Sequence, residues 1–155
     1  MAVLDLLDLP GAIAANAPIV GLDLGEKTIG VAVSDTSRMI ASPLALIRRT
    51  KFTADAAELL KLMESRGAGG LVIGLPVNMD GTEGPRCQSV RAFARNLLRL
   101  RDDLVIGFWD ERLSSAAVNR MLINEADITR ARRAELVDKA AAAWILQGAL
   151  DRLAQ

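Results

Sequence analysis

The segment IVGLDLGEKTIGVAVS, residues 19–34, sets the architecture of this chain. It contains two short apolar runs, residues 19–24 and 29–34, on either side of a four-residue connection. Two such runs joined by a short turn are typical of a β-hairpin. Residues 39–48 form a third candidate strand, and Pro43 within it predicts an edge position or a bulge, because proline cannot donate a ladder hydrogen bond. The segment therefore opens an antiparallel meander.

Strand and helix patterns alternate through the rest of the chain. Apolar residues recur at helical spacing after residue 53, and short apolar runs separate the helical stretches. The pattern predicts, in order, a helix ending at Gly67, a strand over 71–75, a Gly-rich loop over 76–85, a helix over 87–100, a strand over 104–109, and helices over 113–123 and 132–153. We therefore expect an α/β fold with a mixed β-sheet, a three-stranded antiparallel meander plus parallel strands, and helices packed on it.

The domain organisation follows from length and pattern. Residues 1–18 carry only a weak apolar pattern, and we expect an N-terminal extension to which we assign no function. Residues 19–155 are expected to form a single domain, because a chain of 155 residues is long enough for one hydrophobic core. The first residues lack the basic start of a secretory signal, and no apolar run reaches the length of a membrane span. A cytoplasmic protein is expected.

Net charge and amino-acid composition limit which groups can serve in catalysis and in binding. The chain has 19 Lys+Arg and 19 Asp+Glu, so any contact with nucleic acid must come from local basic patches rather than from overall charge. Its single cysteine, Cys87, excludes an internal disulfide. It has no histidine, the commonest general base and transition-metal ligand. Carboxylates remain as the obvious catalytic groups.

Three carboxylates stand out by their surroundings. Asp23 interrupts the first apolar strand, where burial of an unpaired charge is costly. Glu111 follows the strand over 104–109, and active sites of open α/β sheets gather at the carboxyl ends of strands. Because strand side chains alternate between faces, only one of Asp110 and Glu111 can join a shared site. Asp138 has small and apolar neighbours at helical spacing, so it should border the packed face of the last helix.

Each acid also has a purely structural explanation. Asp23 could accept hydrogen bonds from the turn at Gly25. Glu111 could pair with Arg112 at the surface, and Asp138 could lie on a solvated rim. Taken together, however, the three carboxylates are the hard oxygen ligands that Mg²⁺ or Mn²⁺ prefers, and a two-metal phosphodiesterase needs such a set.

Four stretches of the sequence resemble those of the YqgF family. They occur in family order across residues 19–151, and they are GLDLGEKTIGVAVSD (21–35), GLPVNMDGTEG (74–84), DERLSS (110–115), and Val137-Asp138 with Ala141-Ala142 and Ile145-Leu146-Gln147. The resemblance implies an RNase H-like fold, related to Holliday junction resolvases, and a nuclease for 5′-end processing of pre-16S rRNA in ribosome biogenesis. It also implies that Asp23, Glu111 and Asp138 are the catalytic residues and hold Mg²⁺ or Mn²⁺.

Substrate contacts are expected from polar and basic residues near these acids. Lys27 lies at the tip of the hairpin that carries Asp23. An arginine cluster over 130–133 precedes the helix of Asp138 and suits a nucleic-acid backbone. The family usually has a basic residue where this chain has Leu136, so one phosphate contact of the family pattern is in question here. The expected substrate-binding residues are Lys27, Asn78, Arg112, Ser114, Arg130, Arg132 and Arg133.

Two other functions remain open from the sequence. The chain could be a non-catalytic RNA- or DNA-binding module with the same fold. The hairpin that carries Asp23 also resembles the phosphate-binding hairpin of ATPases and sugar kinases, but those proteins need two lobes, which 155 residues do not supply. The expected partner is nucleic acid, either an rRNA precursor or branched DNA, with no membrane contact. Both a monomer and a homodimer are compatible with the sequence.

Overall fold

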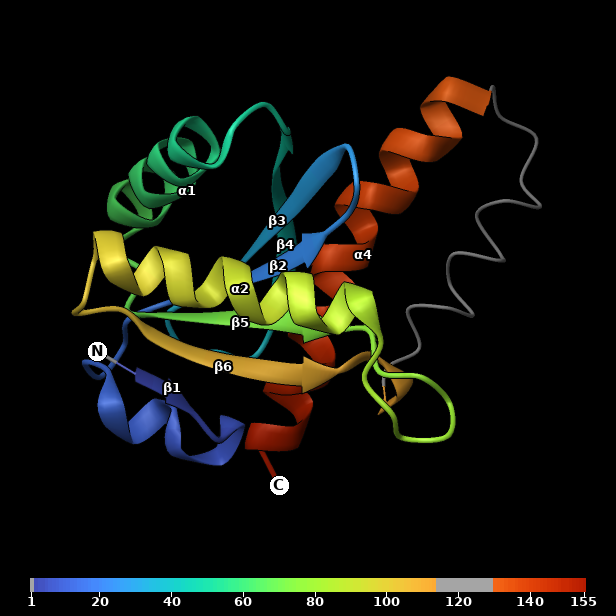
Figure 1. Ribbon diagram of the computed structural model, residues 1–155. Coiled ribbons are helices and arrows are strands. Elements are labelled where there is room, and N and C mark those ends of the chain that lie inside the picture. Colours follow the sequence, from blue (N-terminus) through green and yellow to red (C-terminus); the bar gives the residue numbers. More distant parts are fainter. Residues whose placement is uncertain (1, 114–129) are drawn as a thin grey trace.

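The computed structural model describes residues 2–113 and 130–155, with side chains for residues 3–113 and 140–155 (Figure 1). In this part of the chain a six-stranded sheet has the order β1-β6-β5-β2-β3-β4. The strands are β1 (Ala2–Leu4), β2 (Ile19–Leu24), β3 (Thr28–Ser34), β4 (Ala41–Arg48), β5 (Gly70–Leu75) and β6 (Val105–Asp110). The helices are α1 (Phe52–Arg66), α2 (Pro85–Leu100) and α4 (Arg130–Leu153), with 3₁₀ turns η1 (Leu6–Asp8), η2 (Pro10–Ala12) and η3 (Glu111–Leu113).

The sheet combines antiparallel and parallel pairing, as the sequence predicts. β2, β3 and β4 form the antiparallel meander, and β5, β6 and β1 run parallel to β2. β4 lies at the edge of the sheet, and its pairing with β3 shifts register beside Pro43. Both expectations for the proline strand are therefore confirmed. Because β5 lies between β2 and β6, the carboxyl ends of these three strands meet at one edge.

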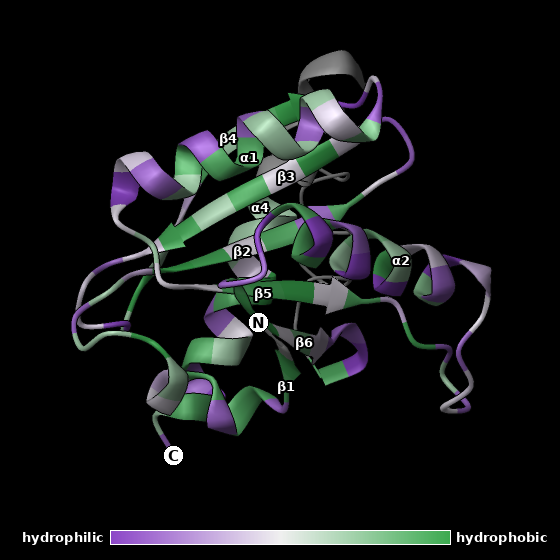
Figure 2. Ribbon diagram, turned by 60° about the vertical axis from the view of Figure 1, so that its left-hand side comes forward, coloured by the Kyte–Doolittle hydropathy of each residue, from purple (hydrophilic) through white to green (hydrophobic). Residues whose placement is uncertain are grey.

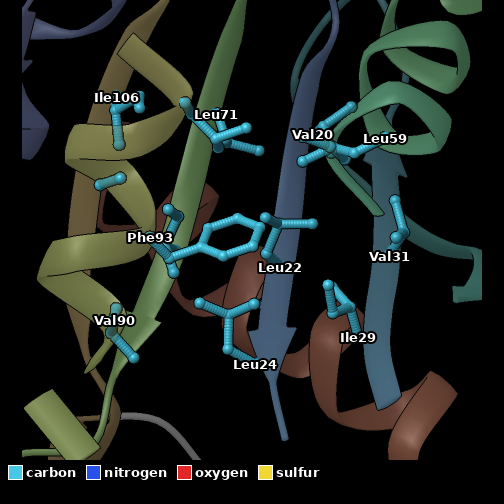
Figure 3. Close-up of a cluster of buried hydrophobic side chains, with 14 of the residues drawn as sticks. Val20, Leu22, Leu24, Ile29, Val31, Leu59, Leu71, Val90, Phe93 and Ile106 are labelled. Carbon is cyan, nitrogen blue, oxygen red and sulfur yellow. The ribbon is translucent and has the colours of Figure 1, made fainter. Parts of the chain in front are cut away.

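Helices cover both faces of the sheet. α1 and α2 lie on one face, and α4 crosses the other (Figure 1). The larger apolar cluster lies beneath α1 and α2, where Leu22, Leu71 and Phe93 come together (Figure 3). A smaller cluster lies beneath α4 and includes Ile145 and Leu146. The strands between the two layers are strongly apolar, whereas α1 and α2 also carry polar stretches (Figure 2). A sheet covered on both faces explains why its central strands read as continuous apolar runs.

Local sequence explains how the helices begin and end. α1 ends at Gly67, whose φ of +64° is left-handed, and the N–H groups of Gly67 and Ala68 donate to the last carbonyls of the helix. α2 begins at Pro85, which suits a first helical position because the N–H there has no partner within a helix. The helix predicted over 113–123 falls almost wholly outside the described residues. Nowhere in the described ranges is a helix both long and apolar enough for a membrane span.

The first residues extend the sheet, which the sequence does not predict. β1 pairs in parallel with β6, from Ala2 opposite Val105 to Leu4 opposite Gly107. Leu9, just after η1, is fully buried in the cluster beneath α4. A strand of three residues is too short to show a sequence pattern, and its pairing with a strand about a hundred residues later is not local.

α4 packs closely against the sheet because glycines lie at the contact. A Cβ atom on Gly21 of β2 would lie 2.7 Å from Leu146 Cβ and 3.3 Å from the carbonyl oxygen of Ala142. On the helix side, a Cβ atom on Gly148 would lie 3.0 Å from the ring of Trp109. Distances this short leave no room for a methyl group, so these glycines set the depth at which the helix lies.

Replacing Gly21 should therefore loosen the helix. We expect Gly21→Ala to lower the free energy of unfolding by about 1–3 kcal/mol, because the added methyl group overpacks the contact with α4. Urea unfolding followed by circular dichroism measures this change. Gly11→Ala is the control, because a Cβ there would have no heavy atom within 4 Å, and its effect should stay within about 0.5 kcal/mol. Equal stabilities of the two variants would contradict the close packing.

Candidate active site

Asp23 lies on the face of the sheet that α4 covers. Its neighbours Leu22 and Leu24 point into the cluster beneath α1 and α2, and Gly21 faces α4. Because side chains alternate along a strand, Asp23 shares the face of Gly21. Its side chain is half-buried near the carboxyl end of β2. The structure thus confirms that an acidic side chain interrupts an otherwise buried strand.

Glu111, the first residue of η3 directly after β6, reaches the same face. A Cβ atom on Gly74 of β5 would lie 3.1 Å from Glu111 Oε1, 3.3 Å from its Cδ and 2.6 Å from Ile145 Cδ1. The Glu111 carboxylate therefore lies over Gly74, next to the side chain of Ile145 from α4. In the register of β2 and β5, Leu22 lies opposite Ile73, which places Asp23 beside Gly74. The structure thus brings Asp23 and Glu111 together on one face, at the carboxyl edge of the sheet.

Asp110 serves a different purpose from Glu111, as side-chain alternation predicts. Its carboxylate accepts hydrogen bonds from the Arg112 guanidinium, the shortest being 2.7 Å from Nη2, and one of 2.9 Å from the Arg112 backbone N–H. These hydrogen bonds hold the pKa of the Asp110 carboxyl below its ordinary value. Arg112 therefore pairs with Asp110. The structural explanation of Glu111, a surface pair with Arg112, is not what the structure shows.

Asp138 belongs to α4, but its side chain lies outside the described part of the structure. Its place in the helix is one turn before Ala142, whose carbonyl oxygen lies over Gly21 of β2. The described residues contain no group of three acidic or sulfur-containing side chains that could hold a metal ion. The convergence of Asp138 with Asp23 and Glu111 thus stays a prediction. Other predicted site residues also lie outside the described side chains, namely Ser114, Arg130, Arg132 and Arg133.

The loop between β5 and α2 has a defined shape and projects beyond the edge of the sheet (Figure 1). Asn78 holds it closed, because its backbone N–H donates to the Thr82 carbonyl at 2.9 Å and its Nδ2 donates to Thr82 Oγ1 at 3.1 Å. Asp80 accepts hydrogen bonds from the backbone N–H and the hydroxyl of Thr82. Gly81, with a φ of +90°, makes the turn. The predicted substrate residue Asn78 is thus an exposed residue that shapes this loop.

Two arginines anchor the loop. Arg91 of α2 forms a bidentate ion pair with Glu83, at 2.7 and 2.8 Å, and its guanidinium lies 5.1 Å from the centre of the Phe108 ring. The Nη1 atom of Arg112 donates to the carbonyl oxygen of Met79 at 3.4 Å. Sequence reasoning did not find the role of Glu83 or Arg91. Their spacing of eight residues spans a loop and a helix, so no local pattern relates them.

Lys27 lies in the turn between β2 and β3, and its side chain is exposed. The turn itself is fixed, because the backbone N–H of Arg49 donates to the Lys27 carbonyl at 2.8 Å and the Gly25 N–H donates to the Thr28 carbonyl at 2.9 Å. Lys27 is therefore held near the end of the strand that carries Asp23.

Comparisons with known proteins give a consistent family. A family model described as "RuvX: Holliday junction resolvase" matches residues 17–152. Proteins of Phenylobacterium zucineum and Caulobacter vibrioides, each named "Putative pre-16S rRNA nuclease", are 77% and 68% identical over 153 residues, covering 99% of this chain and 98% of each relative. These names favour the nuclease hypothesis over a non-catalytic module or a kinase-like fragment.

The fold also has a relative among solved structures. A structure of T. thermophilus RuvC in complex with a Holliday junction substrate aligns with a TM-score of 0.52 at 10% identity, covering 88% of this chain and 96% of that chain. At this identity the likeness concerns the fold alone, and it confirms the RNase H-like α/β architecture expected from the sequence.

The anchoring of the loop should depend on pH. Because the pKa of Asp110 is lowered, its pair with Arg112 contributes fully above the ordinary carboxyl pKa of 3.8, and this contribution is lost as the pH falls below that value. We expect Asp110→Asn to raise hydrogen exchange in the loop over 78–82 at neutral pH, where the native pair is intact. Asp103→Asn is the control, because it breaks a surface pair with Arg101 far from this loop. Identical loop exchange in both variants would contradict the anchoring.

Proposed function

This chain belongs to the RuvX family, also called the YqgF family, and on that premise we propose that it trims the 5′ end of a precursor of 16S ribosomal RNA. The family and its curated relatives make the chain a nuclease, a hydrolase of phosphodiester bonds. The observation that carries the proposal is the position of the Glu111 carboxylate over Gly74, beside the strand of Asp23. Two carboxylates at one edge of a sheet suit metal-assisted phosphodiester hydrolysis.

The donor set fits a hard divalent cation. Asp23 and Glu111 offer carboxylate oxygens, which Mg²⁺ and Mn²⁺ prefer, and the one cysteine, Cys87, is buried in the cluster on the opposite face of the sheet. We propose Asp138 as the third ligand, since its helix passes over the strand of Asp23. When bound, two such cations would activate a water molecule and stabilise the leaving oxygen.

The chain's own residues would position the reacting groups. Asp23 is fixed by a strand that is paired on both sides, and the Glu111 carboxylate is packed over Gly74, which the side chain of Ile145 also covers. Confinement of this kind reduces the side-chain entropy that would be lost when the acids bind. In this proposal Lys27 contacts substrate phosphate directly.

The other predicted substrate residues have two proposed modes of action. Ser114, Arg130, Arg132 and Arg133 are proposed to contact phosphate directly, in the same way as Lys27. Asn78 and Arg112 are proposed to act through the shape of the loop, since Asn78 is hydrogen-bonded within it and Arg112 donates to its Met79 carbonyl.

An RNA precursor is the preferred substrate of this proposal. The two curated relatives carry the name of an rRNA nuclease and share more than two thirds of their aligned residues with this chain. Resolution of branched DNA is the second candidate, because the description of the matching family names a Holliday junction resolvase. Precursor rRNA as substrate would place the protein in the cytoplasm. Cleavage of labelled precursor RNA and of a four-way DNA junction, side by side with and without Mg²⁺ or Mn²⁺, separates the two candidates.

The proposed metal ligands can be tested one at a time. We expect Asp23→Asn to reduce cleavage at least about 100-fold, because a neutral amide cannot replace a carboxylate that holds a divalent cation. The fold should be retained or slightly stabilised, because repulsion among the clustered acids falls. Asp102→Asn, at an exposed acid after α2, is the control and should cleave at the rate of the native chain. Unchanged cleavage by Asp23→Asn would reject the mechanism.

Gly74 offers a test that leaves every acid in place. In Gly74→Ala the new Cβ would lie 2.6 Å from Ile145 Cδ1 and 3.1 Å from Glu111 Oε1, so both side chains must shift. We expect kcat to fall about 10- to 100-fold with little change in KM, because small displacements of a catalytic group are costly. Gly69→Ala is the matched control, since its Cβ would also meet two close side-chain atoms, Ala17 Cβ at 2.9 Å and Ile13 Cβ at 3.1 Å, just before the other end of β5. Equal kcat values for the two variants would show that the position of Glu111 does not matter.

A further inference from the structure

A cavity of about 200 Å³ opens at the carboxyl edge of the sheet, where the turn between β2 and β3 meets the first turns of α2. Its floor is apolar and includes Leu24 and Val90, which are 8% and 4% exposed and lie at the same end of the cluster in Figure 3. Its rim is polar and includes Arg49, Arg86 and Ser89. None of these residues has a place in the proposed chemistry.

The two arginines of the rim differ in how their side chains are held. Arg49 is held by the turn, because its Nη1 donates to the Gly25 carbonyl at 2.7 Å and its backbone N–H donates to the Lys27 carbonyl at 2.8 Å. Arg86 is exposed in the first turn of α2, and its side chain forms no hydrogen bond or ion pair with another described residue. A guanidinium has five N–H donors, so both side chains have donors to offer a ligand.

The lining of the cavity carries a net positive charge, although the chain has equal numbers of acidic and basic residues. Glu26 is the acid among the described residues of the lining, against Arg49 and Arg86. Further exposed basic side chains follow on the neighbouring segments, Lys27 in the β2–β3 turn, Arg48 at the end of β4 and Lys51 before α1. A positive cavity rimmed by guanidinium and hydroxyl groups suits an anion with several oxygen atoms.

The cavity lies close to the acids but on the other face of the sheet. Leu24 of its floor directly follows Asp23 in β2, and adjacent residues of a strand point to opposite faces. A nucleic-acid strand that crosses the carboxyl edge of the sheet would therefore pass from the acids to this cavity. We propose that the cavity binds a backbone phosphate of the substrate near the phosphate that is cleaved, through Arg49, Arg86 and Ser89. The inference rests on the proposed nuclease function.

Salt-dependent binding tests the phosphate site directly. The probe is a fluorescein-labelled RNA stem with a single-stranded 5′ tail, titrated with the full chain in EDTA so that no cleavage occurs. We expect Arg86→Gln to weaken binding about tenfold at low salt, as for the loss of a charge-assisted hydrogen bond. The slope of log K against log salt should become shallower by about 0.7, the value for one lost contact with single-stranded phosphate.

Arg99→Gln is the matched control, because it removes the same charge from the same helix at the opposite end, and its affinity and slope should equal those of the native chain. Arg49→Lys keeps the charge of Arg49 and should retain the slope while losing affinity, because lysine cannot donate to phosphate in a bidentate manner. A mononucleotide competitor identifies the source of the phosphate. Displacement of RNA only at large excess supports a backbone site, whereas tight mononucleotide binding that Arg86→Gln abolishes would reassign the cavity to a free nucleotide and overturn the proposal.

The two proposals fail in different ways. If the native chain cleaves RNA and Arg86→Gln binds the probe with native affinity and slope, the phosphate site is wrong and the nuclease function stands. If the native chain neither binds nor cleaves RNA or junction DNA, the proposed function fails, and the phosphate site fails with it. The thermal unfolding midpoint of each variant is compared with that of the native chain. Equal midpoints show that a loss of binding reflects the missing guanidinium and not a change in the fold.

Discussion

The close contact of α4 with the sheet is the constraint on which the rest of the structure depends. Glycine in a strand lowers stability because it has no side chain to pack, yet Gly21 and Gly74 both lie in the central strands of this sheet. Without their Cβ atoms, Leu146 and Ile145 of the helix lie against the backbone of the strands. The packing that the helix gains offsets what the strands lose. The same depth leaves space over Gly74 for the carboxylate of Glu111.

The two faces of the sheet differ in polarity. Beneath α1 and α2 the buried residues are almost entirely apolar, and this cluster is the larger of the two. On the α4 face a half-buried Asp23 interrupts the strand, which has a free-energy cost unless polar or charged partners compensate it. This cost arises at the carboxyl edge of the sheet, where the strands end. The apolar face can then supply stability undisturbed by the acids.

Much of the fold could be predicted from the sequence, because its elements are local patterns. The hairpin, the edge strand with Pro43 and the helix before Gly67 each depend on residues within a few positions of one another. Side-chain alternation also predicted that only one of Asp110 and Glu111 joins a shared site, and the structure has Asp110 bonded by Arg112. The sequence could not show which side chains pack against a given residue from other elements. In the sequence, Gly74 is only a glycine in an apolar strand. The structure shows that its missing side chain makes room for the carboxylate of Glu111. β1 was not predicted because its partner strand, β6, is distant in the sequence.

Overall charge is a poor guide to the partner of such a chain, because charge acts locally. The Debye length is about 8 Å at physiological salt, so the electrostatic potential of basic residues at one edge of the sheet is largely screened on the far side of the molecule. A neutral chain has no general attraction for polyanions, so affinity for nucleic acid must come from local basic clusters, of which the proposed cavity at this edge is one. Placing the acids and the basic cavity on opposite faces of the same edge then has a consequence for selectivity. A strand that can bend across the edge reaches both, whereas a stiff, straight duplex reaches only one, so the arrangement favours single-stranded tails and flexible junctions over uninterrupted helices.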